Sequence, residues 1–243
     1  MAIPVVALFC WFAPAQASLV IEGTRVVFPS SARDVTVGIV NPDTNAYLMQ
    51  AWLDTTSEAE SRPDTSKAPF MLTPVVSRID AGERRSIRIV PLAATLPQDR
   101  ESIFYLHVLG VPAMPSDVQA DDNFVQVAVR SVIKVFYRPA ALKSTDAVAA
   151  PAALVWRLVP QGRGHALEAH NPTPFHVSFS QFSVDVDGKT IDDFSGGMVG
   201  PGQTVVMSTP RLNAHLAQGG IAIRYTALND WGGRMTEPLT LAK

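Results

Sequence analysis

NFVQVAVRSVIKVFY, residues Asn123–Tyr137, is the stretch of this 243-residue chain that decides its fold. Apolar and polar residues alternate along it, so Val125, Val127 and Val129 share one face of an extended strand. The strand predicted from Asn123 to Phe136 is far longer than the usual length of about five or six residues. A row of valines on so long a strand needs a surface to cover it.

Two interpretations of this valine row are open. The three valines face the core of their own domain, or they belong to an exposed strand edge that is offered to another chain. Proteins normally protect an exposed edge with charges, prolines or bulges, and this stretch carries no charge before Arg130. Alternation alone does not distinguish the two interpretations.

Short alternating runs of the same kind recur along the chain, separated by turn signals such as Asn41-Pro42 and Asp187-Gly188. Stretches with helical periodicity are scarce. The pattern predicts further strands at Thr24–Phe28, Asp34–Val40, Tyr47–Leu53, Arg84–Val90, Ile103–Leu109, His176–Val186, Gln203–Ser208 and Ile221–Thr226. The chain is therefore expected to be all-β.

The number of strands indicates two β-sandwich domains, because one seven-stranded sandwich takes only about 100 residues. The strand signal lapses at residues 139–151, PAALKSTDAVAAP, which are rich in alanine and bounded by prolines. We therefore expect an N-terminal domain over residues 18–138, a linker over residues 139–151 and a C-terminal domain over residues 152–243.

The start of the chain has the features of an export signal. Residues 1–17, MAIPVVALFCWFAPAQA, carry no charged side chain and end in the A-x-A pattern of a cleavage site. They predict a cleaved signal peptide of residues 1–17. Cys10 is the only cysteine, so the exported chain has none to form a disulfide, which fits a periplasm or a cell surface.

Six blocks of sequence resemble the periplasmic chaperones of the chaperone–usher pilus pathway, which include the P-pilus chaperone. They occur in the family's order and span nearly the whole chain after residue 17. The blocks are GTRVVF at Gly23–Phe28, YLMQAW at Tyr47–Trp52, LPQDRESIFY at Leu96–Tyr105, IKVFYRP at Ile133–Pro139, NPTPF at Asn171–Phe175 and NDWGGR at Asn229–Arg234.

The resemblance implies a fold and a function. The fold is two immunoglobulin-like sandwiches set in an L, with a cleft between them. The function is that of a non-catalytic periplasmic chaperone without a cofactor, which binds pilus subunits one to one by donor-strand complementation. Each subunit lacks its last strand, and the chaperone lends its own strand to the open groove until an outer-membrane usher receives the subunit.

The resemblance also implies roles for eight residues. Three apolar side chains of the long strand enter the subunit's groove, two cations bind the subunit's terminal carboxylate, and three charges form an ion network between the domains. These are, in that order, Val125, Val127 and Val129; Arg25 and Lys134; and Glu101, Arg138 and Asp230.

The positions of the valines and of Lys134 conflict on a regular strand. Lys134 is an odd number of residues from Val129, so an ideally pleated strand points their side chains to opposite faces. We therefore expect a bulge or a sharp twist between Arg130 and Lys134. The chain also departs from the family's usual pattern at His107, at Leu109-Gly110 and after Pro112.

Other classes of protein find less support in the sequence. A formal net charge of −2 shows no basic excess for nucleic acid. No known nucleophile, metalloprotease or nucleotide-binding motif occurs, which argues against an enzyme. His170 and His176 are the only pair of histidines near metal-ligand spacing, and they flank a proline-containing turn. An adhesive protein or a pilus subunit remains an alternative, as does self-association of the free chaperone through its valine row.

Overall fold

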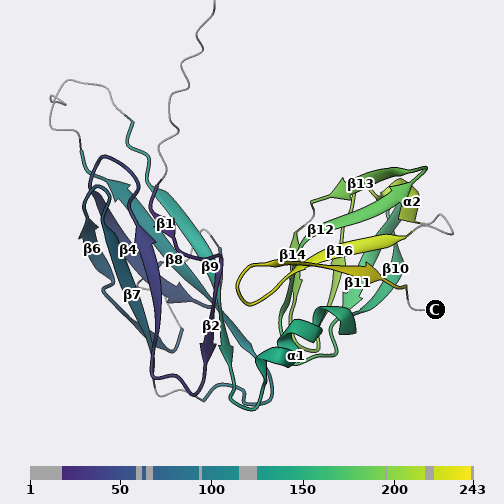
Figure 1. Ribbon diagram of the computed structural model, residues 1–243, viewed down its shortest axis with the longest axis horizontal. Helices are drawn as coiled ribbons and strands as arrows, with labels where there is room; N and C mark the ends of the chain where they lie inside the picture. The colour runs from purple at the N-terminus through teal and green to yellow at the C-terminus, as the bar shows by residue number, and fades with distance from the viewer. Residues whose placement is uncertain are drawn as a thin grey trace, which may run out of the picture.

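The computed structural model describes residues 18–58, 62–63, 68–92, 95–114, 125–194, 196–216 and 222–241. They form two β-sandwiches that diverge from a shared corner in the shape of an L (Figure 1). The predicted signal peptide, residues 1–17, lies outside this part of the chain. Within it, no helix has the length and apolar character needed to cross a membrane.

The N-terminal sandwich packs a four-stranded sheet, in the order β1-β3-β7-β5, on a five-stranded sheet, in the order β2-β9-β8-β4-β6. The strands are β1 Val20–Ile21, β2 Arg25–Pro29, β3 Val35–Val40, β4 Tyr47–Asp54, β5 Phe70–Thr73, β6 Val76–Ile79, β7 Arg84–Pro91, β8 Ser102–Pro112 and β9 Val129–Arg138. Alternate residues of both sheets fill one core, which includes Phe28, Ile39, Leu106 and Val135.

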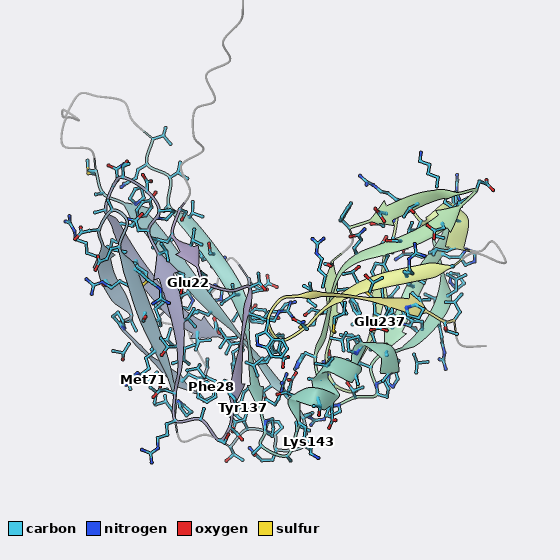
Figure 2. All side chains as sticks on the ribbon, in the orientation of Figure 1. Glu22, Phe28, Met71, Tyr137, Lys143 and Glu237 are labelled. Carbon is cyan, nitrogen blue, oxygen red and sulfur yellow. The ribbon has the colours of Figure 1, made fainter. Side chains whose placement is uncertain are left out.

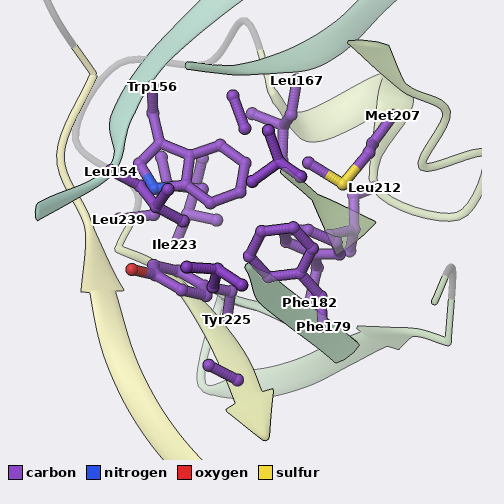
Figure 3. Packing of buried hydrophobic residues seen from close by; sticks show 14 of the residues in the cluster. Leu154, Trp156, Leu167, Phe179, Phe182, Met207, Leu212, Ile223, Tyr225 and Leu239 are labelled. Atoms are coloured by element: carbon purple, nitrogen blue, oxygen red, sulfur yellow. The ribbon is translucent and has the colours of Figure 1, made fainter. Parts of the chain in front are cut away.

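The C-terminal sandwich packs the sheet β10-β11-β15 on a sheet in which β12 pairs with β13, β14 and β16, and β16 pairs with β17. The strands are β10 Val155–Gln161, β11 Gly164–His170, β12 Val177–Val186, β13 Lys189–Asp193, β14 Gly197–Val199, β15 Thr204–Met207, β16 Ile223–Leu228 and β17 Arg234–Leu239, with a short helix α2 at Asn213–Leu216. Trp156, Phe179, Phe182 and Tyr225 pack together at the centre of its core (Figure 3).

The segment predicted as a linker contains helical structure. Helix α1, Ser144–Ala149, is followed by the 3₁₀ helix η2, Pro151–Ala153. Alanine favours helix, and Pro151 takes the first position of η2, where its missing N–H costs nothing. The Tyr225 hydroxyl donates a hydrogen bond to the Pro151 carbonyl at 2.5 Å, which ties this connection to the C-terminal core.

Each strand predicted from alternation is present, with shifted ends, and the largest shift affects the long strand that carries the valine row. The prediction started that strand at Asn123, but β9 begins at Val129, and residues 125–128 are not part of a strand. Asn123 lies outside the described residues. Several other strands were not predicted. Two of these, β10 and β17, contain Pro160 and Pro238, and both are edge strands, where proline is tolerated.

Candidate functional site

One side of β9 is paired for only half of its length. On one side β8 pairs with β9 along the whole strand, from Gly110 opposite Val129 to Ser102 opposite Tyr137. On the other side, the parallel partner β2 starts at Arg25, opposite Lys134, and continues to Pro29. Within the described residues, no strand pairs with the edge of β9 that precedes Lys134, and this free edge lies on the side of the domain that faces its neighbour (Figure 1).

The predicted bulge between Arg130 and Lys134 is absent. The β8–β9 pairs keep one register from end to end, without a bulge. That expectation was wrong because it assumed that the valines and Lys134 must share a face. Lys134 points to the face of the sheet opposite to that of Val129, and each face has its own neighbours.

The face that carries the valines is continuous with the core of the N-terminal sandwich. Val135 is 0% exposed and Ile133 packs partly against the core, whereas Val129, Val127 and Val125 are 40%, 64% and 89% exposed. The interpretation that the three valines face the core of their own domain is therefore wrong. The core contacts on this strand belong to Val135 and Ile133, and the chain has left the core by Val129.

Arg25 and Lys134 lie side by side where the free edge ends, and neither forms an ion pair with a carboxylate in the described part of the chain. Arg25 donates a hydrogen bond from Nη1 to the Leu228 carbonyl at 3.2 Å, and its Nε is buried without a partner. Lys134 Nζ donates to the Ser178 hydroxyl, also at 3.2 Å. Both partners belong to the C-terminal domain, so the two cations lie between the domains.

Electrostatics make this pair of cations a place for an anion. Burial lowers the pKa of Lys134, and the positive charge of Arg25 lowers it further. Burial also lowers the pKa of Arg25, and the carboxylate of Asp230 offsets part of that effect. Two partly dehydrated cations of like charge repel each other, and a carboxylate between them would relieve both costs.

Arg138 joins the two domains through two carboxylates. Its Nε donates to Glu101 at 2.8 Å, and its Nη1 and Nη2 donate to the two oxygens of Asp230 at 2.6 and 2.8 Å. The Arg138 and Glu101 side chains are nearly fully buried. Burial lowers the pKa of Arg138, but the bonds to Asp230 and Glu101 outweigh it and the pKa is raised. The structure brings all three predicted network residues together.

Three neighbours of these charges were not assigned to this site from the sequence. His176 donates its backbone N–H to Glu101 at 2.8 Å, and its ring packs at a tilt against Phe136, with 5.4 Å between the ring centroids. The Phe175 ring lies under the Arg138 guanidinium, with 5.4 Å between the guanidinium carbon and the ring centroid. The Ser178 hydroxyl accepts the hydrogen bond of Lys134. Their only signal in the sequence is that they lie in or directly after the NPTPF block.

The paired histidines considered as metal ligands have other contacts. His170 Nδ1 lies 3.0 Å from the Thr204 hydroxyl, and His176 Nδ1 lies 3.2 Å from Glu101. Over the residues that the structure describes, no three His, Cys, Asp or Glu side chains gather as a metal site would require.

Two immunoglobulin-like sandwiches joined at an angle, with a free strand edge that ends at two cations, define the class of a two-domain binding protein. Two family models match the chain: "Pili and flagellar-assembly chaperone, PapD N-terminal domain" over residues 18–143 and "Pili assembly chaperone PapD, C-terminal domain" over residues 149–239. The chain belongs to the pilus-assembly chaperone family, whose members are periplasmic chaperones and not enzymes.

Individual relatives are similar over nearly their whole length. The probable fimbrial chaperone YadV of Escherichia coli is 38% identical over 89% of this chain and 87% of its own. The crystal structure of the Pseudomonas aeruginosa CupB2 chaperone is 34% identical, with a TM-score of 0.74 over 92% of this chain and all of the other. The Salmonella enterica SafB chaperone, solved in complex with the SafA pilin, is 25% identical, with a TM-score of 0.71 over 94% and 99% of the two chains.

Proposed function

We propose that this pilus-assembly chaperone captures a pilus subunit by adding the free edge of β9 to the subunit's incomplete sheet. The observation that carries the proposal is that this edge ends at Arg25 and Lys134, two cations without a carboxylate partner in the described residues. The complex of the related SafB chaperone with a pilin supports a pilus subunit as the partner.

The geometry of β2 predicts the direction of the added strand. β2 runs parallel to β9 and occupies its edge from Lys134 onward, so a subunit strand on the preceding part of the edge stops where β2 starts. A strand parallel to β9 reaches this point with its C-terminal end, and an antiparallel strand reaches it with its N-terminal end. Only the parallel strand delivers a carboxylate to Arg25 and Lys134, where charge-assisted hydrogen bonds fix its register.

The exposed valines supply the apolar part of the contact. Val125, Val127 and Val129 would enter the open groove of the subunit in place of its missing strand. Burial of one valine contributes about 1.5 to 3 kcal/mol, so three contribute about 5 to 9 kcal/mol before the cost of ordering the partners. This gain holds a subunit and still permits its release.

Further parts of the function follow from the same surfaces. The Arg138 network, with Glu101 and Asp230, fixes the angle between the domains and so the distance between the cation pair and the C-terminal domain.

The free chaperone hides its valine row by self-association, and an outer-membrane usher receives the loaded complex. The chain is exported to the periplasm, and residues 1–17 are removed as a signal peptide.

The carboxylate anchor is tested by co-expression with the pilus subunit whose gene neighbours that of this chain. The wild type should co-purify with the subunit as a soluble one-to-one complex, and Arg25→Ala should lose the complex while its thermal unfolding stays close to that of the wild type. Arg78→Ala is the matched control, because Arg78 lies on β6 and pairs with the exposed Asp80, which directly follows that strand. A normal yield of complex with Arg25→Ala, or polymers of the chain itself, would reject the proposal.

A further inference from the structure

A pocket of about 540 Å³ lies elsewhere on the N-terminal domain, but the cleft contains a second hollow, of about 470 Å³, that is formed by both domains. The N-terminal domain contributes Tyr105, Val132 and Lys134 to this cleft pocket, and the C-terminal domain contributes Phe179, Gly197 and Met198. The strands β9 and β14, which contribute to its lining, lie on the facing sides of the two domains in Figure 1. Its lining is apolar apart from Lys134, the tyrosine hydroxyl and Ser57 at its rim.

The register of the strands puts this pocket beside the cation pair. Tyr105 is directly opposite Lys134 in the β8–β9 ladder, and Val132 lies two residues before Lys134, so all three side chains share the face that looks into the cleft. Across the cleft, Met198 of β14 is directly opposite Ser178 of β12, which is the residue that accepts the hydrogen bond of Lys134.

Met198 forms the wall of the pocket on the C-terminal domain. Its neighbour Gly197 is directly opposite Phe179 in the β12–β14 ladder, and a Cβ at position 197 would stand 3.4 Å from the sulfur of Met207, a core residue. Gly197 and Phe179 therefore face the core of the sandwich, whereas Met198 faces the cleft. The pocket thus offers an apolar side chain the thioether of Met198 and the aliphatic side chain of Val132.

We propose that the cleft pocket receives an apolar side chain from one of the last two residues of the bound subunit, and that it selects subunits by this residue. The inference rests on the strand addition proposed above. A strand parallel to β9 points its side chains alternately to the valine face and to the cleft face, so one of its last two residues faces the cleft. The carboxylate of this strand is at Lys134, and Lys134 itself lines the pocket on the cleft face.

The charges of the cleft favour this occupant over a free small molecule. The cation pair requires an anion and the adjoining wall requires apolar surface, and the C-terminal residue of a polypeptide supplies both in one group. Because the two walls belong to different domains, the width of the pocket depends on the inter-domain angle. The same Arg138 contacts that hold the domains together therefore also set the size of the side chain that fits.

The test uses synthetic strand peptides of alternating serine and valine with a free C-terminal carboxylate. In one series the last residue, and in another the residue before it, is alanine, leucine, phenylalanine or lysine, and binding to the full chain is measured by calorimetry. At one of the two positions phenylalanine should bind about tenfold more tightly than alanine, or better. An amidated peptide of the same sequence reports on the carboxylate anchor alone.

Met198→Asp gives the decisive comparison, because it places a carboxylate in the pocket. At the position that reports on the pocket, this variant should prefer lysine over phenylalanine, which is the reverse of the wild-type order. Val206→Asp is the matched control. Val206 is an exposed apolar residue of β15, in the sheet of the same domain that does not line the cleft, and its replacement should leave the order unchanged. Val132→Trp fills the pocket from the other domain and should abolish the gain from phenylalanine.

The outcomes separate the two proposals. If the free carboxylate is required but neither position responds to side-chain size, or Met198→Asp keeps the wild-type order, the pocket has no role in selection and only the inference is overturned. If acid and amide bind equally, or no peptide binds, strand addition at the cation pair is overturned, and the inference with it.

Discussion

Lys134 is a cation that the fold buries between two domains without giving it an acidic partner among the described residues. Its ammonium group has one hydrogen bond, to Ser178, and a second cation beside it in Arg25. An arrangement of this kind lowers the stability of the free protein, since burial and like charge both disfavour the ammonium form. Functional sites often carry such a cost, and here the cost prepares a place for an anion.

Replacing Lys134 by methionine should therefore separate stability from function. Lys134→Met keeps the length of the side chain and removes its charge, so the free energy of unfolding should rise by about 1 kcal/mol while capture of the subunit is lost. Urea unfolding monitored by circular dichroism gives the first quantity, and co-purification gives the second. A clear loss of stability would show that the ammonium group supports the fold instead.

Alkaline pH should weaken the binding of the subunit carboxylate. The pKa of Lys134 is lowered in the free chaperone, so as pH rises this lysine loses its proton before an ordinary lysine, with a pKa of about 10.4, does. Binding needs the protonated form. Affinity should therefore be full below the lowered pKa and fall as pH rises through it. Lys134→Arg keeps its charge at alkaline pH, and its affinity, measured by titration calorimetry, should stay flat over this range; an equal decline would contradict the assignment.

At the scale of one element, β9 changes its environment along its length while its pleat stays regular. The face that carries Val135 is covered by the opposite sheet, whereas the same face at Val129, where β9 begins, is exposed, and so is Val127 in the segment before the strand. The reason is the length of the neighbours: β8 ends at Pro112 and β2 begins only opposite Lys134. One short tie remains beyond the strand, from the Gln126 amide to the Pro112 carbonyl at 2.6 Å.

Two aspartate substitutions on this face should have opposite effects. Val127→Asp places a charge in solvent, so thermal unfolding of the free protein should hardly change, while co-purification of the subunit is lost because a carboxylate cannot enter an apolar groove. Val135→Asp buries the same charge in the core and should lower the free energy of unfolding by about 3 kcal/mol or more. Normal capture of the subunit by Val127→Asp would refute the role of the valine row.

At the scale of the whole molecule, Arg138 is the residue through which the two sandwiches hold their angle. It binds Glu101 within its own domain and Asp230 in the loop between β16 and β17, a loop that reaches from the C-terminal domain toward the N-terminal one (Figure 1). Side chains of both domains reach this corner of the molecule, close to Tyr137 and Phe28, which lie next to each other in Figure 2.

Reversing the charge of Asp230 should make the angle between the domains variable. In Asp230→Lys the new ammonium group faces the Arg138 guanidinium at a buried position, and the two domains should separate there while each stays folded. Small-angle scattering should show a wider distribution of sizes. Asp185→Lys is the control, because Asp185 pairs with Arg224 at an exposed site within one domain. An unchanged scattering profile for Asp230→Lys would count against the network.

The sequence by itself determined the all-β class, and its similarity to a family pointed to eight site residues. Alternation is a local property, so it survives in any strand, whatever the strand packs against. Strands β10 and β17 each contain a proline, which is tolerated in an edge strand but not in a central one. They were not predicted because the sequence does not say which strands lie at an edge. Glycine at position 110, a departure from the family pattern, was likewise unexplained until the fold placed the Leu19 side chain 3.1 Å from where its Cβ would be.

Only the tertiary structure decided how the long strand works. The sequence places the side chains of the valine row and of Lys134 on opposite faces of a regular strand. The conflict disappears because the two faces have different neighbours, the proposed subunit groove on one side and the cleft on the other. Burial depends on where neighbouring strands end, and those ends are set by residues far away in the chain, here Pro112 and Arg25. For the same physical reason, no local pattern could place Met198 opposite the serine that holds Lys134.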